Sequence, residues 1–308
     1  MLPIMNSYNY VMNIKKIIII PLLKWAGGKR ELLPELRRFY EGLEFNNYYE
    51  PFFGGGSVYI DIIKTFGIEK RNSSFINDIN TDLVNLLRDV SQNPDEIINN
   101  LYKLKDDYEK NDYYYIRDRF NGIDREKNKV EKYIGTIRSS SLIVLNRTCF
   151  NGLYRTNKTG LFNVPSGNYK NPRIVNEENI KLFSSILPPP ENILNLDFSL
   201  IKDIKKNDLV YFDPPYQPIN KTSSFTEYSG SFGENKQKEL FEFFSELDRK
   251  GVFVILSNSS TDFIHNLYQE FNPFKVYCSR NINSKGNNRG KVEEVIVIGK
   301  SLRRELKL

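Results

Sequence analysis

Short apolar runs of strand length alternate with amphipathic stretches along most of the chain, and this alternation predicts a doubly wound α/β sheet. The clearest strand is 208–212, an apolar and aromatic run. It must end at Asp213, because the two prolines that follow cannot donate hydrogen bonds to a neighbouring strand. Other strands are predicted at 48–50, 74–76, 193–196, 252–256, 274–278 and 292–298.

Between 81 and 146 the apolar positions keep helical spacing without strand-like alternation, so we predict a helical insertion in the sheet. The chain then divides into a discontinuous sheet domain, 15–80 and 174–308, and a helical domain, 81–173. The first 14 residues follow neither pattern and are predicted to form an irregular lead-in. Helices are predicted at 31–40, 57–63, 82–90, 94–110, 113–120, 130–145, 176–187, 236–249 and 261–271.

The strand 208–212 is followed directly by Asp213, Pro214, Pro215 and Tyr216. Open α/β sheets bind their ligands at the carboxyl ends of strands. There a carboxylate and a carbonyl can accept hydrogen bonds from an exocyclic amino group while an aromatic ring stacks on the base. An ordinary turn is the simpler interpretation, since Asp and Pro are common turn residues. We therefore interpret the four residues as a candidate catalytic loop that needs support from its context.

A second strand-to-helix turn is rich in glycine. Strand 48–50 leads through Phe52, Gly54 and Gly56 into a helix, as in the first half of a Rossmann-type unit. Asp78 follows Gly56 by 22 residues, the spacing at which an acidic residue binds ribose hydroxyls. The glycines do not match Gly-x-Gly-x-x-Gly, so an adenosyl ligand without phosphates is favoured over a dinucleotide. Asp197 and Phe198, after strand 193–196, are suited to hold an adenine amino group and its face.

Charge singles out one further stretch. The chain carries 44 basic and 38 acidic residues, a net charge of +6, which favours a polyanionic partner. Six basic residues and no acidic ones lie between 138 and 173, interleaved with Asn, aromatic and Gly residues. A solvated basic loop is the plainer interpretation of such a run, but Arg and Asn are also the side chains that recognise base edges. The six are Arg138, Arg147, Arg155, Lys158, Lys170 and Arg173.

Composition excludes several other classes. The single histidine, His265, argues against His-based metal sites and Ser-His triads, and no metal site is predicted. Cys149 and Cys278 have neither metal-ligand spacing nor the density of a disulfide scaffold. Gly-Gly-Lys at 27–29 lacks the spacing of a phosphate loop. The apolar run 17–23 is too short to span a bilayer, so we expect a soluble, cytoplasmic protein without a membrane partner.

Several motifs occur in a fixed order along residues 23–299. They are Lys24-Trp25-Ala26-Gly27-Gly28-Lys29, Pro51-Phe52-Phe53-Gly54-Gly55-Gly56-Ser57, Asn77-Asp78-Ile79-Asn80, Asn151-Gly152-Leu153-Tyr154-Arg155, Phe162-Asn163-Val164-Pro165 and Asp213-Pro214-Pro215-Tyr216. In this order they resemble the DNA adenine methylases of the Dam type, in particular the GATC-specific enzymes of restriction-modification systems.

The resemblance implies a Rossmann-like methyltransferase sheet that uses S-adenosylmethionine, with 81–173 as an inserted helical target-recognition domain. The implied reaction is methyl transfer to N6 of a flipped-out adenine in double-stranded DNA, in the sequence GATC. It also allows a cognate restriction endonuclease that acts on the same site.

The resemblance also implies roles for individual residues. It places the catalytic residues at Asp213, Pro214, Pro215 and Tyr216, Leu153 and Pro165 against a thymine methyl, and Arg155 at a guanine. With the residues derived above, the predicted cofactor contacts are Trp25, Lys29, Phe52, Gly54, Gly56, Asp78, Asp197, Phe198 and Asp213. The predicted DNA contacts are Lys24, Arg147, Phe150, Asn151, Leu153, Arg155, Pro165 and Tyr169.

Three alternatives stay open at this point. Cytosine-N4 methylation uses the same kind of loop, although Asp in place of Ser as its first residue favours adenine. A methylase of RNA or of a protein amide would share the fold and the cofactor. The chain is also compatible with a catalytically inactive methylase fold that only binds DNA.

Overall fold

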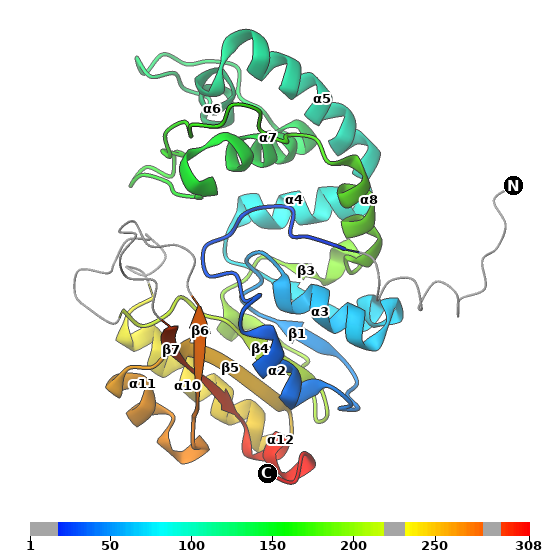
Figure 1. Cartoon of the computed structure of the whole chain (residues 1–308), viewed down its shortest axis with the longest axis vertical. Helices are drawn as coiled ribbons and strands as arrows, with labels where there is room; N and C mark the ends of the chain where they lie inside the picture. Colours follow the sequence, from blue (N-terminus) through cyan, green and yellow to red (C-terminus); the bar gives the residue numbers. More distant parts are fainter. Residues whose placement is uncertain (1–17, 219–231, 280–290) are drawn as a thin grey trace, which may run out of the picture. The chain divides into compact units, whose positions relative to one another are not determined.

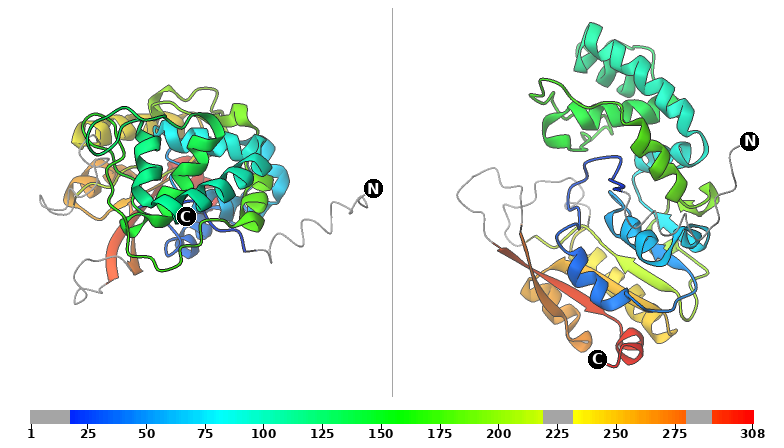
Figure 2. Two further views of the ribbon diagram at one scale, coloured as in Figure 1. Left: turned by 90° about the horizontal axis from the view of Figure 1, so that it is seen from above. Right: turned by 45° about the vertical axis from the view of Figure 1, so that its right-hand side comes forward.

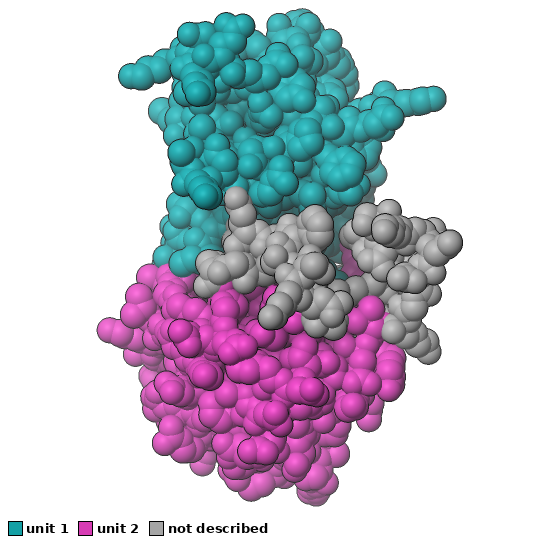
Figure 3. All heavy atoms as spheres, turned by 90° about the vertical axis from the view of Figure 1, so that its left-hand side faces the viewer, with its two compact units in different colours: residues 1–28, 54–72, 78–195 teal, residues 29–53, 73–77, 196–308 magenta. Residues whose placement is uncertain are grey.

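The computed structural model describes residues 18–218, 232–279 and 291–308, so the predicted lead-in at 1–14 lies outside the described residues. The chain packs into two compact units (Figures 1 and 3). Unit 1 comprises residues 1–28, 54–72 and 78–195, and unit 2 comprises 29–53, 73–77 and 196–308. These units are defined by backbone packing. The boundaries of the predicted helical target-recognition domain, 81 and 173, stay a prediction.

Unit 2 holds the sheet (Figure 1). Six of the seven described strands belong to it, in the order β2-β1-β4-β5-β7-β6. Strands β1 (Tyr48–Glu50), β2 (Ser74–Asn77), β4 (Leu209–Phe212) and β5 (Phe253–Ser259) are parallel. Strand β7 (Lys291–Ile298) runs antiparallel to both β5 and β6 (Phe274–Ser279). The sheet confirms the predicted α/β class.

The register brings the carboxyl ends of the parallel strands to one edge. Phe212, the last residue of β4, lies opposite Leu256 of β5, so Asp213 follows beside Ser257. All four residues of β4 are buried, as the continuous apolar run requires for a strand covered on both faces. Strand β5 continues to Ser259, beyond the predicted end at 256, because its last residues pair with β7 as far as Glu294.

Helices α2 (Leu33–Tyr40), α10 (Glu234–Arg249), α11 (Asp262–Leu267) and α12 (Lys300–Glu305) complete unit 2 (Figures 1 and 2). Helices α10 and α12 both pack on β5. The predicted helix 261–271 is instead α11 followed by a separate 3-10 turn, Gln269–Phe271. The ring of Phe244 on α10 meets the edges of Tyr268 and Phe271, which anchors this turn.

Unit 1 is mainly helical. Helices α4 (Thr81–Gln92), α5 (Pro94–Asn111) and α6 (Tyr113–Asn121) pack around α7 (Gly135–Thr148). Nine of the 14 residues of α7 are buried, so this helix forms the centre of the bundle. Helix α3 (Ser57–Phe66), helix α8 (Glu177–Ile186) and the two-residue strand β3 (Ile193–Leu194) also belong to this unit. The run of helices from 81 to 148 confirms the predicted helical insertion.

The structure corrects two further predicted boundaries. The helix predicted at 130–145 begins only at Gly135, because the Val130 and Tyr133 amides donate to the carbonyls of Gly122 and Arg119 at the end of α6. The strand predicted at 193–196 ends at Leu194. The Asn77 side chain donates to the Leu196 carbonyl and accepts the Leu196 amide hydrogen, so these backbone groups do not pair with a strand. No helix in the described part of the chain is long and apolar enough to cross a membrane.

Candidate functional site

The predicted catalytic loop leaves β4 with its first side chain held in place. Oδ1 of Asp213 accepts hydrogen bonds from Lys29 Nζ at 2.8 Å and from Ser257 Oγ at 3.1 Å. Burial raises the pKa of Asp213 above its ordinary value, and the Lys29 charge together with the Ser257 hydrogen bond lowers it again in part. Burial and the Lys29 cation thus have opposite effects on the pKa of Asp213.

The ring of Tyr216 lies in the same charged cluster. Lys29 Nζ is 4.6 Å from the ring centroid, within the range of a cation–π contact. The Tyr216 hydroxyl donates to Glu294 on β7 at 3.1 Å. Burial, with the charges of Asp213 and Glu294, raises the pKa of Tyr216 well above its ordinary value, so the hydroxyl stays protonated at physiological pH. Lys29 and Glu294 together fix the plane of the ring.

Two buried amides that the sequence analysis missed hold the backbone of this loop. Gln237 Nε2 donates to the Pro215 carbonyl at 2.9 Å, and Asn258 Nδ2 donates to Gln237 Oε1 at 3.1 Å. Asn258 Oδ1 in turn accepts the Gln217 amide hydrogen at 3.1 Å. Asn258 could have been recognised as a polar residue in a buried strand, but Gln237 lies on α10 without a local signal. The loop is therefore bracketed on both sides by side chains distant in sequence.

Aromatic rings gather around Phe52 in unit 2. Its ring lies 5.4 Å from Phe198 and 5.6 Å from Phe232, which it meets edge to face. Asp197, next to Phe198, pairs with Lys236 at 3.1 Å. Although burial acts to raise it, hydrogen bonds from Ser199 and Lys236 lower the pKa of Asp197. The structure thus brings Phe52, Asp197 and Phe198 together as an apolar surface with a carboxylate at its side.

The glycine turn belongs to unit 1. Gly54, with φ +50°, leaves no room for a side chain, because a Cβ there would lie 2.9 Å from Cδ1 of the Trp25 indole. Asp78 Oδ2 accepts the Gly54 amide hydrogen at 2.9 Å, and its Oδ1 accepts that of Asn80 at 2.9 Å. Burial raises the pKa of Asp78, whereas these backbone hydrogen bonds lower it. Gly56 caps α3 at φ +68°.

The predicted DNA-binding residues cluster in the segment after α7. Phe150 is half exposed, and its amide donates to the Pro165 carbonyl at 2.9 Å, which joins the two predicted contact residues. Asn151 has φ +56° and is exposed. The Arg155 side chain is exposed and oriented by Asn163, whose Oδ1 accepts its Nε hydrogen at 2.7 Å.

Three other predicted residues lie at the margins of this segment. Lys24 Nζ lies 3.3 Å from the Tyr169 hydroxyl and 4.9 Å from the centre of its ring. Arg147, on α7, donates to the Leu22 carbonyl at 3.0 Å. Burial, with the neighbouring charge of Arg173, lowers the pKa of Arg147. Lys24 and Tyr169 are thus brought together at the surface, whereas Arg147 is engaged by the backbone of its own unit.

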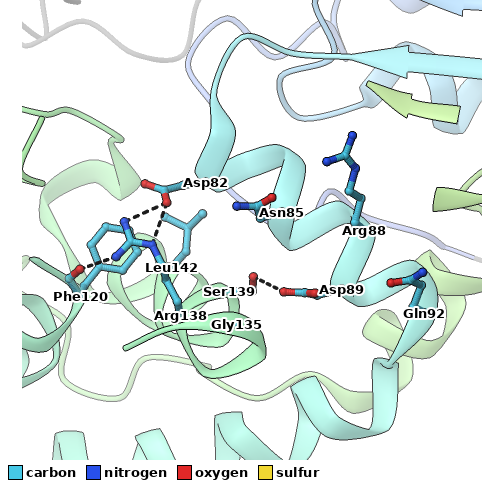
Figure 4. A pocket seen from close by; sticks show the side chains of 10 residues that line it. All are labelled: Asp82, Asn85, Arg88, Asp89, Gln92, Phe120, Gly135, Arg138, Ser139 and Leu142. Carbon is cyan, nitrogen blue, oxygen red and sulfur yellow. Dashed lines mark hydrogen bonds and ion pairs between the residues drawn. The ribbon is translucent and has the colours of Figure 1, made fainter. Parts of the chain in front are cut away.

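A separate pocket of about 300 Å³ lies between α4 and α7 (Figure 4). Its lining contains none of the predicted site residues, so it is distinct from the clusters above. Figure 4 shows Asp82 paired with Arg138 and Asp89 with Ser139 across it. The lining residues are Asp82, Asn85, Arg88, Asp89, Gln92, Phe120, Gly135, Arg138, Ser139 and Leu142.

Comparison with known proteins identifies the family of the chain. Residues 25–282 match the family model described as D12 class N6 adenine-specific DNA methyltransferase. The chain is 40% identical to the type II methyltransferase M.MjaIII of Methanocaldococcus jannaschii, over 87% of this chain and 94% of that protein. It is 38% identical to the type II methyltransferase M1.LlaDCHI of Lactococcus lactis subsp. cremoris, over 92% and 96%. With a DNA adenine methylase of Haemophilus influenzae the identity is 33%, over 90% and 93%. The chain therefore belongs to the D12 class of N6-adenine-specific DNA methyltransferases.

Proposed function

We propose that this adenine-specific DNA methyltransferase uses S-adenosylmethionine and modifies the adenine of GATC in duplex DNA, with Asp213 facing the amino group that is methylated. The observation that carries the proposal is the geometry of the Asp213 carboxylate. Within the described part of the chain both of its contacts, Lys29 and Ser257, fall on Oδ1. Oδ2 is then the atom that accepts a hydrogen bond from the substrate.

The amino nitrogen of adenine is a poor nucleophile, because its lone pair is delocalised into the ring. Hydrogen bonds from this group to Asp213 and to the Pro214 carbonyl favour the tetrahedral form, and they stabilise the positive charge that develops on nitrogen. Tyr216, held by Lys29 and Glu294, offers a face on which a flipped base stacks. This mechanism needs no covalent intermediate, and burial raises the pKa of the Cys149 thiol to about 11, so that thiol is unsuited as a nucleophile.

The cofactor, when bound, supplies an electrophilic methyl group on a sulfonium, and we assign contacts to it residue by residue. In unit 1 the Asp78 carboxylate, oriented by the backbone amides of Gly54 and Asn80, suits a ribose hydroxyl. Gly54 and Gly56 let a ligand approach the backbone beside Trp25. In unit 2 the rings of Phe52 and Phe198 suit the face of an adenine, and Asp197 suits its amino group. We assign Lys29 and Asp213 to the same cofactor.

For the DNA we propose two kinds of contact. Phe150, Asn151, Leu153, Arg155 and Pro165 recognise bases or fill the space left by the flipped one, and they share one surface segment after α7. The second kind of contact holds that segment in place or binds the DNA phosphates, and we assign it to Lys24, Arg147 and Tyr169. The names of two relatives, both type II methyltransferases, support a further proposal, that a restriction endonuclease shares the target site.

The test is to map methylated adenines in DNA from cells that express the protein, and then to compare wild type with Asp213→Ala on a GATC duplex. We expect methylation of GATC adenines by the wild type. The variant should lose methyl transfer but bind the duplex with near-normal affinity, because Asp213 does not contribute to the recognition of the groove. Methylation at other sites would overturn the target assignment. Near-normal turnover by Asp213→Ala would overturn the mechanism.

The alternative functions are less well supported than adenine methylation. The family match specifies N6 of adenine, which disfavours cytosine-N4 methylation. RNA and protein substrates can be added to the same assay. An inactive DNA-binding protein would bind the cofactor and the duplex without transferring methyl groups.

A further inference from the structure

Tyr154 lies between two residues of the DNA-binding segment, Leu153 and Arg155, yet its side chain contacts the predicted cofactor turn. Its ring stacks on the Trp25 indole, with 5.6 Å between centroids and 26° between planes. The Phe162 ring also packs edge to face with the Tyr154 ring, with 5.7 Å between centroids. The Tyr154 hydroxyl donates to Asp82 Oδ2 at 2.9 Å. Both ends of the side chain are thus engaged within unit 1.

The contacts continue from Trp25 to the start of α4. The indole packs against the backbone of Gly54, whose amide donates to Asp78 Oδ2. Asp78 precedes α4, and Asp82 lies in its first turn. The series Asp82–Tyr154–Trp25–Gly54–Asp78 therefore begins and ends at the same helix terminus and forms a closed ring of contacts.

A second link ties the same two segments together. Asn146 is 1% exposed, and its Oδ1 accepts the Lys24 amide hydrogen at 2.7 Å. Its Nδ2 donates to the Lys24 carbonyl at 2.9 Å and to the Gly152 carbonyl at 2.8 Å. The Lys24 side chain also lies against the Gly152 backbone, since a Cβ on Gly152 would lie 2.5 Å from Cδ of Lys24. Segments 24–25 and 152–154 are therefore constrained to move together.

The anchor of the Tyr154 hydroxyl is itself fixed. Arg138 donates to Asp82 Oδ1 through Nε at 3.0 Å and is within 2.9 Å of it through its second nitrogen (Figure 4). Arg138 also donates to the Phe120 carbonyl, and its guanidinium lies 3.9 Å from the centre of the Phe120 ring. Displacement of the DNA-binding segment must therefore either break the bond between Tyr154 and Asp82 or move the indole.

We propose that Tyr154 is a positioning residue that couples DNA binding to cofactor binding in this enzyme. DNA held by Leu153 and Arg155 fixes the position of Tyr154, and Tyr154 fixes the indole that borders the glycine turn. A protein that has bound one ligand has already ordered part of the site for the other, so the two bind with positive cooperativity. The inference rests on the proposed cofactor and DNA roles of these segments.

Trp25 is the only tryptophan in the chain, so its fluorescence reports on this contact directly. The cofactor is titrated into the protein alone and into the protein saturated with GATC duplex, with calorimetry in parallel. The ratio of the two dissociation constants is the coupling factor. We expect a ratio of at least about 5 for the wild type, the lower end of typical coupling.

Two variants remove different parts of the link. Tyr154→Phe keeps the ring but loses the bond to Asp82 and should lower the ratio in part, whereas Tyr154→Leu should bring it close to 1. Asp82→Asn, which weakens the same bond from its other end, should match Tyr154→Phe and serves if the leucine variant does not fold. Tyr102→Leu, at a half-exposed tyrosine of α5, is the matched control and should keep the wild-type ratio.

The outcomes separate this inference from the proposed function. A wild type that binds neither ligand would contradict the proposed function itself. A wild type that binds both with a ratio of 1 would overturn only the coupling. A folded Tyr154→Leu variant with the wild-type ratio would show that the contact is structural packing and nothing more.

Discussion

At the scale of residues, the proposed mechanism depends on the charge of one carboxylate, that of Asp213. Asp213 must be ionised to accept hydrogen bonds from the amino group. Burial opposes ionisation, and so does the nearby Glu294, whereas Lys29 and Ser257 favour it. Lys29 favours ionisation through the 2.8 Å ion pair, and its ammonium group also contacts the Tyr216 ring. In the proposed mechanism, Lys29 therefore extends activity towards lower pH.

This account predicts the effect of Lys29→Met on the pH profile. Activity is lost as pH falls through the pKa of Asp213, because the protonated acid no longer accepts both hydrogen bonds. Without Lys29 that pKa rises further, so the acid limb of the single-turnover rate should move to higher pH. The rate is measured at saturating cofactor and DNA from pH 5 to pH 9.

Lys236→Met is the matched control, since Lys236 also pairs with an aspartate, Asp197, which is separate from the catalytic loop. It should leave the acid limb where the wild type has it. An unshifted limb in Lys29→Met would mean that another group controls the ionisation of Asp213.

At the scale of elements, local sequence signals predict the end of a strand or helix where the backbone chemistry of the residues themselves ends it. The two prolines after Phe212 end β4 as predicted, and the continuous apolar run 209–212 is buried on both faces. The start of α7 was missed because the amides of Val130 and Tyr133 bond to the end of α6, a contact without a local pattern. Gln237 was missed for the same reason, since it contacts the loop from far away in sequence, and the contacts of Tyr154 with Trp25 and Asp82 likewise have no local pattern.

The glycine turn offers a test at this scale. Gly54→Ala should displace Trp25, because the new Cβ would lie 2.9 Å from the indole in a backbone conformation that already disfavours side chains. We expect a shifted Trp25 emission and at least a tenfold weaker cofactor affinity, measured by fluorescence and calorimetry. Gly42→Ala is the control, with φ +80° but no atom within 4 Å of a new Cβ.

Gly42→Ala should lower the free energy of unfolding by about 1 kcal/mol, the usual cost of backbone strain, and leave the cofactor affinity unchanged. If the two alanine variants behave alike, the tight approach of Trp25 to Gly54 has no role in the binding of the cofactor.

At the scale of the whole molecule, the net charge of +6 bears on DNA binding only through residues that face solvent. Of the six basic residues between 138 and 173, Arg138 is paired with Asp82 and Arg147 donates to a backbone carbonyl. The four that are exposed are Arg155, Lys158, Lys170 and Arg173. Only these four of the six basic side chains are thus exposed and available to contact phosphates or bases.

These basic residues should differ in how they affect DNA binding. Lys158→Ala and Lys170→Ala remove charges that meet phosphates, so each should weaken binding to GATC and unrelated duplexes alike and reduce the salt slope by about one. Arg155→Ala should instead relax the preference at one guanine, since a bidentate pair contributes roughly 1–3 kcal/mol of discrimination. Arg138→Ala, the control, should lower the melting temperature and leave the salt slope unchanged, because its charge is already paired with Asp82.

Dissociation constants are measured by fluorescence anisotropy between 50 and 200 mM salt, with duplexes altered at one base pair of GATC. Asn163, which holds Arg155 Nε at 2.7 Å, keeps the guanidinium in one orientation, so a positional effect is expected in place of a general one. If Arg155→Ala weakens every duplex equally and lowers the salt slope as the lysine variants do, Arg155 is a phosphate contact. The recognition of guanine would then have to come from another residue of the segment.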